Sequence, residues 1–387
     1  MIPYIIFFLV SLAFVFIDIQ NAPSVVKKTL LLFFGCFFIL FAGVRWETGT
    51  DWDNYYAYFN IVPHLSIGNT GFEILYEYLV RSVHLFSDDF ASLNFVTASL
   101  IIIPTYVSIY YSSPYPLFSV FLLLTYSLNS SGFGYRQDIA IALTTSSFIF
   151  AYRRQLIPFA SLVILASLVH QSAFIFIFAY WLINFKWSAK SSKYLFLLVL
   201  IGSIVSSQIV GLAGLYSESA AGKVGGYSNL EFSESTGDGS NPYLIIIRGV
   251  LNRSFLLIIS GICVFKYLNY PNKEIATKFF NIYMFGFILF ILFSPLGTVF
   301  TRFTRYFDIF FIFLIPICLY SVNNKKRYNL LILIIFYCSL KLLTFLALDD
   351  ETYVPYKTKK YFTYQYNILC PTNSSAFCTF RTISYRS

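Results

Sequence analysis

Residues 3–19 read PYIIFFLVSLAFVFIDI and residues 28–44 read KTLLLFFGCFFILFAGV, with a short, more polar stretch between them. A helix needs about 20 predominantly apolar residues to cross the hydrocarbon core of a bilayer, or somewhat fewer if its ends are polar. The two runs therefore predict two consecutive transmembrane helices. No basic stretch precedes the first run and no small-residue cleavage site follows it, so we interpret it as a span and not as a cleavable signal.

The apolar pattern of these runs recurs along all 387 residues, of which 57% are apolar and 12% charged. Soluble domains average about 25% charged residues, and half that fraction leaves too little polar surface to coat a globule. The predicted fold class is therefore an all-α polytopic membrane protein. About twelve transmembrane helices are predicted, at residues 3–19, 28–44, 92–111, 115–131, 135–152, 156–169, 171–185, 194–214, 250–268, 277–294, 304–321 and 328–347.

The predicted spans form a single transmembrane domain, residues 1–348, with two longer loops and a polar tail. The loops cover residues 45–91 and 215–249. The tail, residues 349–387, carries no motif that indicates its role. Within the first loop, residues 72–86 predict an amphipathic helix that lies on the membrane surface.

The polar residues of this amphipathic helix define its expected ends and faces. Asn69 or Thr70 is the expected N-cap. Glu73, Glu77 and Arg81 follow one another at intervals of four residues, which places them on one side of a helix. We expect that side to face solvent.

The charged residues orient the predicted spans, because cytoplasmic loops of membrane proteins are enriched in Lys and Arg. If the loop with Lys27 and Lys28 is cytoplasmic, most of the other lysines fall on the same side and most acidic residues on the opposite side. Both termini are then predicted outside. This asymmetry accounts for the net charge of +9, so the charge does not indicate binding to nucleic acid.

Arginines are unexpectedly frequent on the predicted outer side, where the positive-inside tendency does not require them. The planar guanidinium binds phosphate oxygens two at a time, so these residues favour an anionic ligand that approaches from outside. The alternative is that each one forms a structural ion pair with a nearby acid. The arginines concerned are Arg45, Arg81, Arg136, Arg248, Arg253, Arg302 and Arg305.

The stretch 45–59 after the second predicted span combines an arginine, acidic residues and aromatic residues. Aromatic faces stack on sugar rings, and a carboxylate can accept hydroxyl hydrogen bonds or act as a general base. The alternative is an interfacial aromatic belt with solvated acids. The candidates for sugar binding or catalysis are Arg45, Trp46, Asp51, Asp53 and Tyr55.

Two further motifs place arginines where predicted spans begin. Arg136 is unfavourable for the dipole of the helix that it opens, which favours a shared anion or an ion pair with Asp138 or another acid. Arg302 and Arg305, three residues apart, share a helix face and fit a pyrophosphate, with Asp308 as an alternative partner for Arg305.

His170 lies at the junction between two predicted spans and is a candidate general base near neutral pH. The alternative is a hydrogen-bonded core histidine. The sequence has no P-loop and no Cys or His cluster with metal-ligand spacing, so it predicts neither a cofactor nor a metal.

The order of these motifs resembles the EpsG-like branch of the Wzy-type polysaccharide polymerases. The resemblance covers about residues 1–356 and does not include the tail. It rests on Arg45, Gly49, Asp51 and Tyr55 after an early span, Arg136 opening a middle span, His170 and Ser172, Arg302-x-x-Arg305-Tyr306-Phe307, and Tyr353-Val-Pro-Tyr356 near the end.

The resemblance implies a GT-C-like, metal-independent glycosyltransferase in the bacterial inner membrane. Such enzymes join oligosaccharide units carried on undecaprenyl pyrophosphate at the outer membrane face, moving the growing chain onto a new lipid-linked unit. The implied partners are that lipid-linked oligosaccharide, the membrane, and a chain-length regulator and a flippase of the same pathway.

The candidate residues divide by their expected roles. The expected catalytic residues are Arg302 and Arg305 for the leaving pyrophosphate, and His170 or Asp51 as the base. The expected substrate-binding residues are Arg45, Trp46, Asp53, Tyr55, Arg136, Arg248 and Arg253.

Two alternative functions remain open on the sequence. A GT-C enzyme that adds one sugar from a polyprenyl monophosphate would suit Asp51 and Asp53, but it needs fewer phosphate-binding arginines. A flippase for lipid-linked oligosaccharides should show internal repeats and charges near the middle of the bilayer. A membrane O-acyltransferase fits less well, because the predicted inner loops are short.

Overall fold

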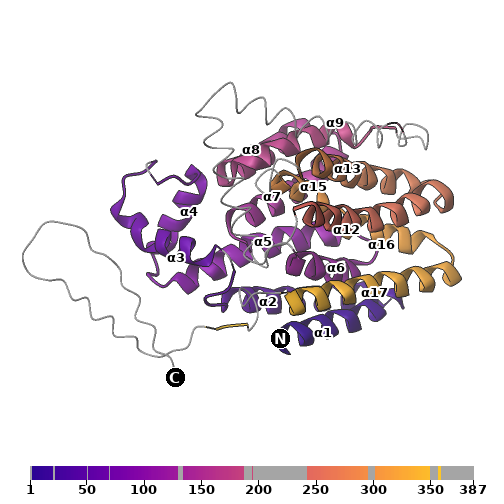
Figure 1. Cartoon of the computed structure of the whole chain (residues 1–387), viewed down its shortest axis with the longest axis horizontal. Coiled ribbons are helices and arrows are strands. Elements are labelled where there is room, and N and C mark those ends of the chain that lie inside the picture. Colours follow the sequence, from indigo (N-terminus) through magenta and orange to yellow (C-terminus); the bar gives the residue numbers. More distant parts are fainter. Residues whose placement is uncertain are drawn as a thin grey trace, which may run out of the picture.

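The computed structural model describes residues 2–20, 22–49, 51–68, 70–129, 134–186, 194, 242–294, 301–348 and 356–358. In these ranges every extended regular element is a helix, and the only β-type pairing printed on the backbone is an isolated bridge between Arg45 and Thr358. The elongated helices lie side by side, and the short helices α3 and α4 lie together beside one end of the bundle (Figure 1).

The elements follow one another with short connections. They are α1 (Ile2–Ile19), α2 (Ser24–Gly43), α3 (Trp52–Ile61), η1 (Val62–His64), α4 (Ile74–His84), α5 (Phe90–Ser112), α6 (Pro116–Asn129), α7 (Arg136–Tyr152), α8 (Leu156–Val169), η2 (Gln171–Phe178), α9 (Ala179–Leu182), α12 (Pro242–Ile262), η3 (Cys263–Tyr267), α13 (Asn272–Phe293), η5 (Arg302–Thr304), α15 (Arg305–Asp308), α16 (Phe311–Ser321) and α17 (Asn324–Leu348).

Seven helices among the described residues are long and apolar enough to cross a membrane. They coincide with predicted spans and confirm a polytopic helical membrane protein. They are Ile2–Ile19, Ser24–Gly43, Phe90–Ser112, Gly249–Tyr267, Asn272–Phe293, Arg302–Ser321 and Asn324–Ala347. The predicted span 194–214 lies outside the described residues except for Tyr194. The count of twelve stays a prediction.

The burial of these helices distinguishes the centre of the bundle from its periphery. In the most apolar window of Arg302–Ser321, 83% of the residues are buried, against 22% for α17. The exposed large side chains of α17 are apolar and recur at helical spacing. Such a face needs a hydrocarbon solvent. These residues are Ile332, Leu333, Phe336, Leu340 and Leu343.

The predicted spans 156–169 and 171–185 form a short helical hairpin in the structure. The 14 residues of α8 extend about 21 Å, less than the roughly 30 Å of a hydrocarbon core. The second arm is a 3₁₀ helix over Gln171–Phe178 before it becomes α9. Hydrogen bonds between Arg154 and Tyr180 join the far ends of the arms. His170 forms the turn, and α4 packs against α8 beside it.

The first loop is more structured than predicted. Helix α3 was not expected, and the expected helix 72–86 is found as α4 with Glu73 as its N-cap, so capping by Thr70 is wrong. Asn69 lies outside the described residues. The expected solvent exposure of Glu77 is also wrong: it is fully buried and accepts hydrogen bonds from Arg81 and Thr70. Tertiary packing of α4 on α3, α5 and α8 reverses the expectation.

Two other boundaries differ from the prediction. Helix α12 begins at Pro242, so residues 242–249 of the predicted second loop are helical. Pro is favoured in the first turn of a helix, where its missing N–H has no partner to lose. The start of the predicted tail also packs on the bundle: the Tyr356 ring stacks on Phe41 at 4.4 Å, and the Lys357 carbonyl accepts from the Trp46 N–H at 2.9 Å.

Gly286 permits the close approach of α13 and α15, which positions Asp308. A Cβ at Gly286 would lie 2.7 Å from the Cβ of Phe307 and 3.1 Å from Oδ1 of Asp308. At Gly261 of α12, the nearest atom would be 3.5 Å away, in Phe280. We therefore expect Gly286→Ala to lower stability by about 1–3 kcal/mol through overpacking, and Gly261→Ala to be neutral or stabilising.

Thermal unfolding in detergent measures this difference. Both substitutions gain the same helix propensity, so Gly261→Ala is the matched control. Equal midpoints for the two variants would contradict the close packing of α13 on α15.

Candidate functional site

A cavity of about 280 Å³ lies at the end of the bundle that carries α3 and α4, between α6, α12, α13, α15 and α17. Its wall holds four cationic side chains and one carboxylate. The excess of positive charge favours an anionic occupant. The lining residues are Thr125, Tyr126, Asn252, Arg253, Leu256, Tyr283, Thr301, Arg302, Arg305, Asp308, Phe311, Tyr337 and Lys341.

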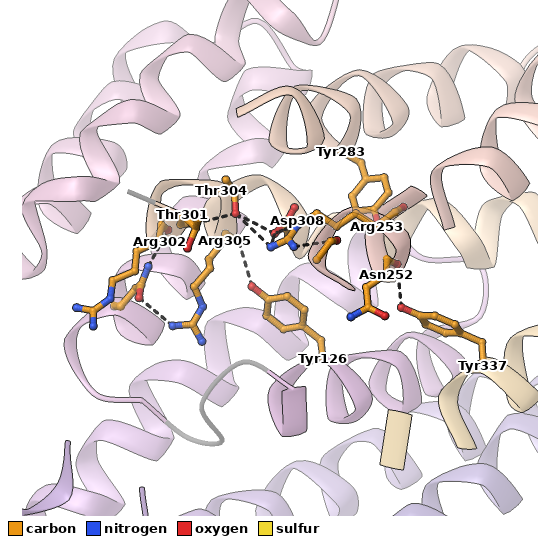
Figure 2. A network of polar contacts seen from close by, with 12 residues as sticks. Tyr126, Asn252, Arg253, Tyr283, Thr301, Arg302, Thr304, Arg305, Asp308 and Tyr337 are labelled. Carbon is orange, nitrogen blue, oxygen red and sulfur yellow. Dashed lines mark hydrogen bonds and ion pairs between the residues drawn. The ribbon is translucent and has the colours of Figure 1, made fainter. Parts of the chain in front are cut away.

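Arg253 of α12 is held rigidly in this wall by Asp308 of α15 (Figure 2). Its Nε and Nη2 donate to Oδ2 of Asp308 at 2.9 and 2.7 Å, and Nη2 also lies 3.4 Å from Oγ1 of Thr304. The guanidinium stacks over Phe290, 3.8 Å from the ring centre. Asp308 therefore partners Arg253, and the alternative in which it partners Arg305 is wrong.

Arg305 and Arg302 project away from the Arg253–Asp308 pair in Figure 2. Gln137 of α7 connects them: its side chain accepts from Nη1 of Arg305 at 2.9 Å and donates to the Arg302 carbonyl at 2.9 Å. Asp138 is the nearest acid to Arg305, at 4.0 Å. The Arg302 side chain is exposed. Neither arginine is neutralised by a close carboxylate contact among the bonds described, so both retain charge for a ligand.

Tyrosines fix the backbone that carries these cations. Tyr126 donates to the Arg305 carbonyl at 3.2 Å, and Tyr283 donates to the Arg253 carbonyl at 3.2 Å. Tyr337 donates to the Asn252 carbonyl at 3.1 Å. Each bond joins a different helix to the cavity wall, so the wall is preorganised.

Sequence reasoning missed Lys341, which lines the cavity from α17. The signal was available, because a lysine within an otherwise apolar span is rare and marks a functional position by default. Its ammonium lies 5.6 Å from the ring centre of Tyr337, one turn earlier on the same helix.

A second polar cluster joins Glu73, Arg136 and His170. Glu73 forms an ion pair with Nη1 of Arg136, and its Oε1 lies 3.1 Å from Nδ1 of His170. Arg136 also donates to the Tyr55 hydroxyl at 3.1 Å and stacks on Phe72. Arg136 thus forms the ion pair that the sequence left open as an alternative, although with Glu73 and not with Asp138.

Glu73 was assigned to a solvent-facing side and its role was missed, because its partners lie 63 and 97 residues away in the chain. Burial alone raises the pKa of this carboxyl, but the hydrogen bond to His170 and the charge of Arg136 outweigh burial and lower the pKa to about 2. An ionised carboxylate only accepts hydrogen bonds. Nδ1 of His170 must then carry the proton, which leaves Nε2 of the neutral ring as an acceptor.

This pKa has a consequence for acid stability. Because the pKa of Glu73 falls from 4.5 to about 2 on folding, its contribution is complete above pH 4.5 and is lost as the pH falls towards 2. We expect Glu73→Gln to remove up to a few kcal/mol at neutral pH and to flatten the loss of stability between about pH 4.5 and 2. Thermal unfolding against pH measures it. An unchanged acid profile would contradict the pairing.

The two clusters are adjacent. Ser172, two residues after His170, hydrogen bonds to the hydroxyl of the buried Tyr306 at 2.8 Å, and Tyr306 follows Arg305. Gln137, which contacts Arg305, follows Arg136. The start of α7 therefore contributes one residue to each cluster.

The aromatic motif 45–59 forms a packed cluster on α3. Trp52 stacks on Tyr56 at 4.9 Å, and Trp46 lies edge-on to Trp52 at 5.1 Å. Tyr55 is buried and contacts Arg136.

The charged residues of this motif are placed differently from one another. Asp51 and Asp53 are exposed. Arg45 is buried, with its guanidinium 5.0 Å from the ring centre of Tyr135. The structure does not describe the side chain of Arg248. The expected roles of all these residues stay predictions.

The family comparison covers most of the chain. The model of the EpsG family matches residues 28–358. The chain belongs to the EpsG family. The match ends at Thr358, the residue whose backbone pairs with Arg45, so the EpsG region includes the segment that returns from the C-terminal side to the first loop.

EpsG membership supports a polymerase-like membrane protein of polysaccharide biosynthesis. No curated protein and no solved structure matches the chain.

Proposed function

We propose that this EpsG protein is a polysaccharide polymerase. It transfers a glycan from undecaprenyl pyrophosphate onto a new lipid-linked repeat unit at the outer face of the bacterial inner membrane. The observation that carries the proposal is the cavity with four cationic side chains and one carboxylate at one end of a helical membrane bundle. A departing pyrophosphate develops negative charge that such a cavity stabilises.

Arg302 and Arg305 stabilise the leaving group in the proposed reaction. The bond between the anomeric carbon and the phosphate oxygen breaks, and the sugar passes through an oxocarbenium-like state. Arg305 is oriented by Gln137, which holds its fork in one direction. Arg253 adds a fixed positive charge, partly balanced by Asp308.

His170 is the general base of the proposed reaction. Glu73 accepts from Nδ1 and orients the ring, and Nε2 takes the proton from the acceptor hydroxyl. This arrangement favours His170 over Asp51, because Asp51 is exposed and makes no side-chain hydrogen bond at the start of α3.

Deletion of the gene tests the proposal. In a host that attaches the polymer to a lipopolysaccharide core, we expect the deletion to abolish the ladder of chain lengths on a gel and to retain the band with one repeat unit. Loss of the single-unit band would instead indicate that repeat assembly or flipping is the missing step. A single-unit band of lower mass would support a transferase that adds one sugar.

A further inference from the structure

Lys341 lies where the cavity meets the lipid-facing surface of the bundle. Its helix, α17, is peripheral, with 22% of its apolar window buried. Lys341 lines the cavity, whereas the adjacent Leu340 is 45% exposed and Leu343 is 60% exposed. Helix α17 therefore separates the cavity from lipid by the thickness of one helix.

Helix α12 has the same arrangement across the seam. Asn252 and Arg253 line the cavity, and the adjacent Leu251 is 63% exposed. The two helices meet where Tyr337 donates to the Asn252 carbonyl and stacks on Phe255 at 4.7 Å. Lys341 is one helical turn beyond Tyr337, towards the end of α17.

The placement of Lys341 is costly unless an anion occupies the cavity. An ammonium in an apolar helix can reach water only near the helix end or a polar cavity. Lys341 faces a cavity that already holds three arginines, so its charge adds to a like-charged wall. A phosphate group compensates this repulsion.

We propose that Lys341 binds a phosphate of a polyprenyl-linked substrate and that the prenyl chain leaves the cavity sideways, between α12 and α17. The proposal rests on the proposed function and adds to it a phosphate-binding residue and a route for the lipid. The apolar residues Leu251 and Leu340 border this route, so the prenyl chain stays in contact with hydrocarbon while its headgroup is in the cavity.

Binding to the purified full-length protein tests the role of Lys341. We expect Lys341→Met to weaken binding of undecaprenyl pyrophosphate by about tenfold or more, since a charge-assisted contact is lost, and Lys341→Arg to retain most of the affinity. Lys325→Met, an exposed lysine at the other end of the same helix, is the matched control and should bind as the unaltered protein does. Unaltered affinity in Lys341→Met would overturn the proposal.

Two further outcomes test the route. Inorganic pyrophosphate should bind more weakly than the lipid; equal binding would mean that the ligand is a free phosphate and would overturn the lipid part. A polyprenyl pyrophosphate with a photoreactive group in its chain should label α12 and α17, and labelling of α1 and α2 instead would also overturn it. These binding results are separate from the gene deletion: a lost ladder with normal binding by Lys341→Met would contradict this inference alone.

Discussion

Arg305→Ala is expected to lower the rate of polymerisation about 10²–10³-fold, because removing one preorganised donor to the charge of the transition state typically has that effect. The guanidinium is held by Gln137 at 2.9 Å and faces the cavity, so its loss removes charge where the pyrophosphate is proposed to depart. The ladder of chain lengths should nearly disappear. Protein levels should stay normal, since Arg305 forms no close ion pair among the bonds described.

Matched variants separate loss of charge from loss of shape. Arg305→Lys keeps the charge but not the fork, so its rate should lie between those of the alanine variant and the unaltered protein. Arg302→Ala should also nearly abolish the polymer. Arg153→Ala, an exposed arginine at the opposite end of α7, should leave the ladder unchanged. A near-normal ladder in Arg305→Ala, with normal protein level, would end the assigned role.

Arg253→Met is expected to destabilise the protein by about 3–5 kcal/mol, because it leaves Asp308 as an uncompensated buried charge. Asp308 is 6% exposed and lies in the most buried helix of the bundle. Its Oδ2 accepts from Arg253 and from Thr304, and only the arginine supplies a balancing charge. The measurement is thermal unfolding in detergent or in lipid nanodiscs.

The double variant Arg253→Met with Asp308→Leu tests this reason. Leucine has nearly the shape of aspartate, and removing both charges removes the unpaired one. We expect the double variant to be more stable than Arg253→Met alone, although inactive. If adding Asp308→Leu lowered stability further, packing and not charge would explain the loss.

Much of the fold was predictable because a bilayer imposes strict demands on sequence. A helix that contacts hydrocarbon needs an apolar run of defined length, and seven predicted spans have this form in the structure. The short hairpin at His170 was less predictable. Its apolar residues look like those of a full span, and only the contacts between α4 and α8 and between Arg154 and Tyr180 distinguish it.

The candidate site was predictable by residue type and not by pairing. Arg302, Arg305 and Arg253 were recognised because arginines outside the cytoplasmic loops need a reason, and all three line one cavity. Glu73 was misplaced because helical spacing puts it beside Glu77 and Arg81, whereas the structure turns it towards His170.

The sequence by itself determined that this protein is a bundle of membrane helices with cationic residues gathered near one set of helix ends, because hydrocarbon excludes charge wherever it can. Only the tertiary structure decided which charges meet. Arg253 and Asp308 are 55 residues apart in the chain, and Glu73 and His170 are 97 apart. Whether such residues touch depends on how their helices pack, and local periodicity carries no record of that packing.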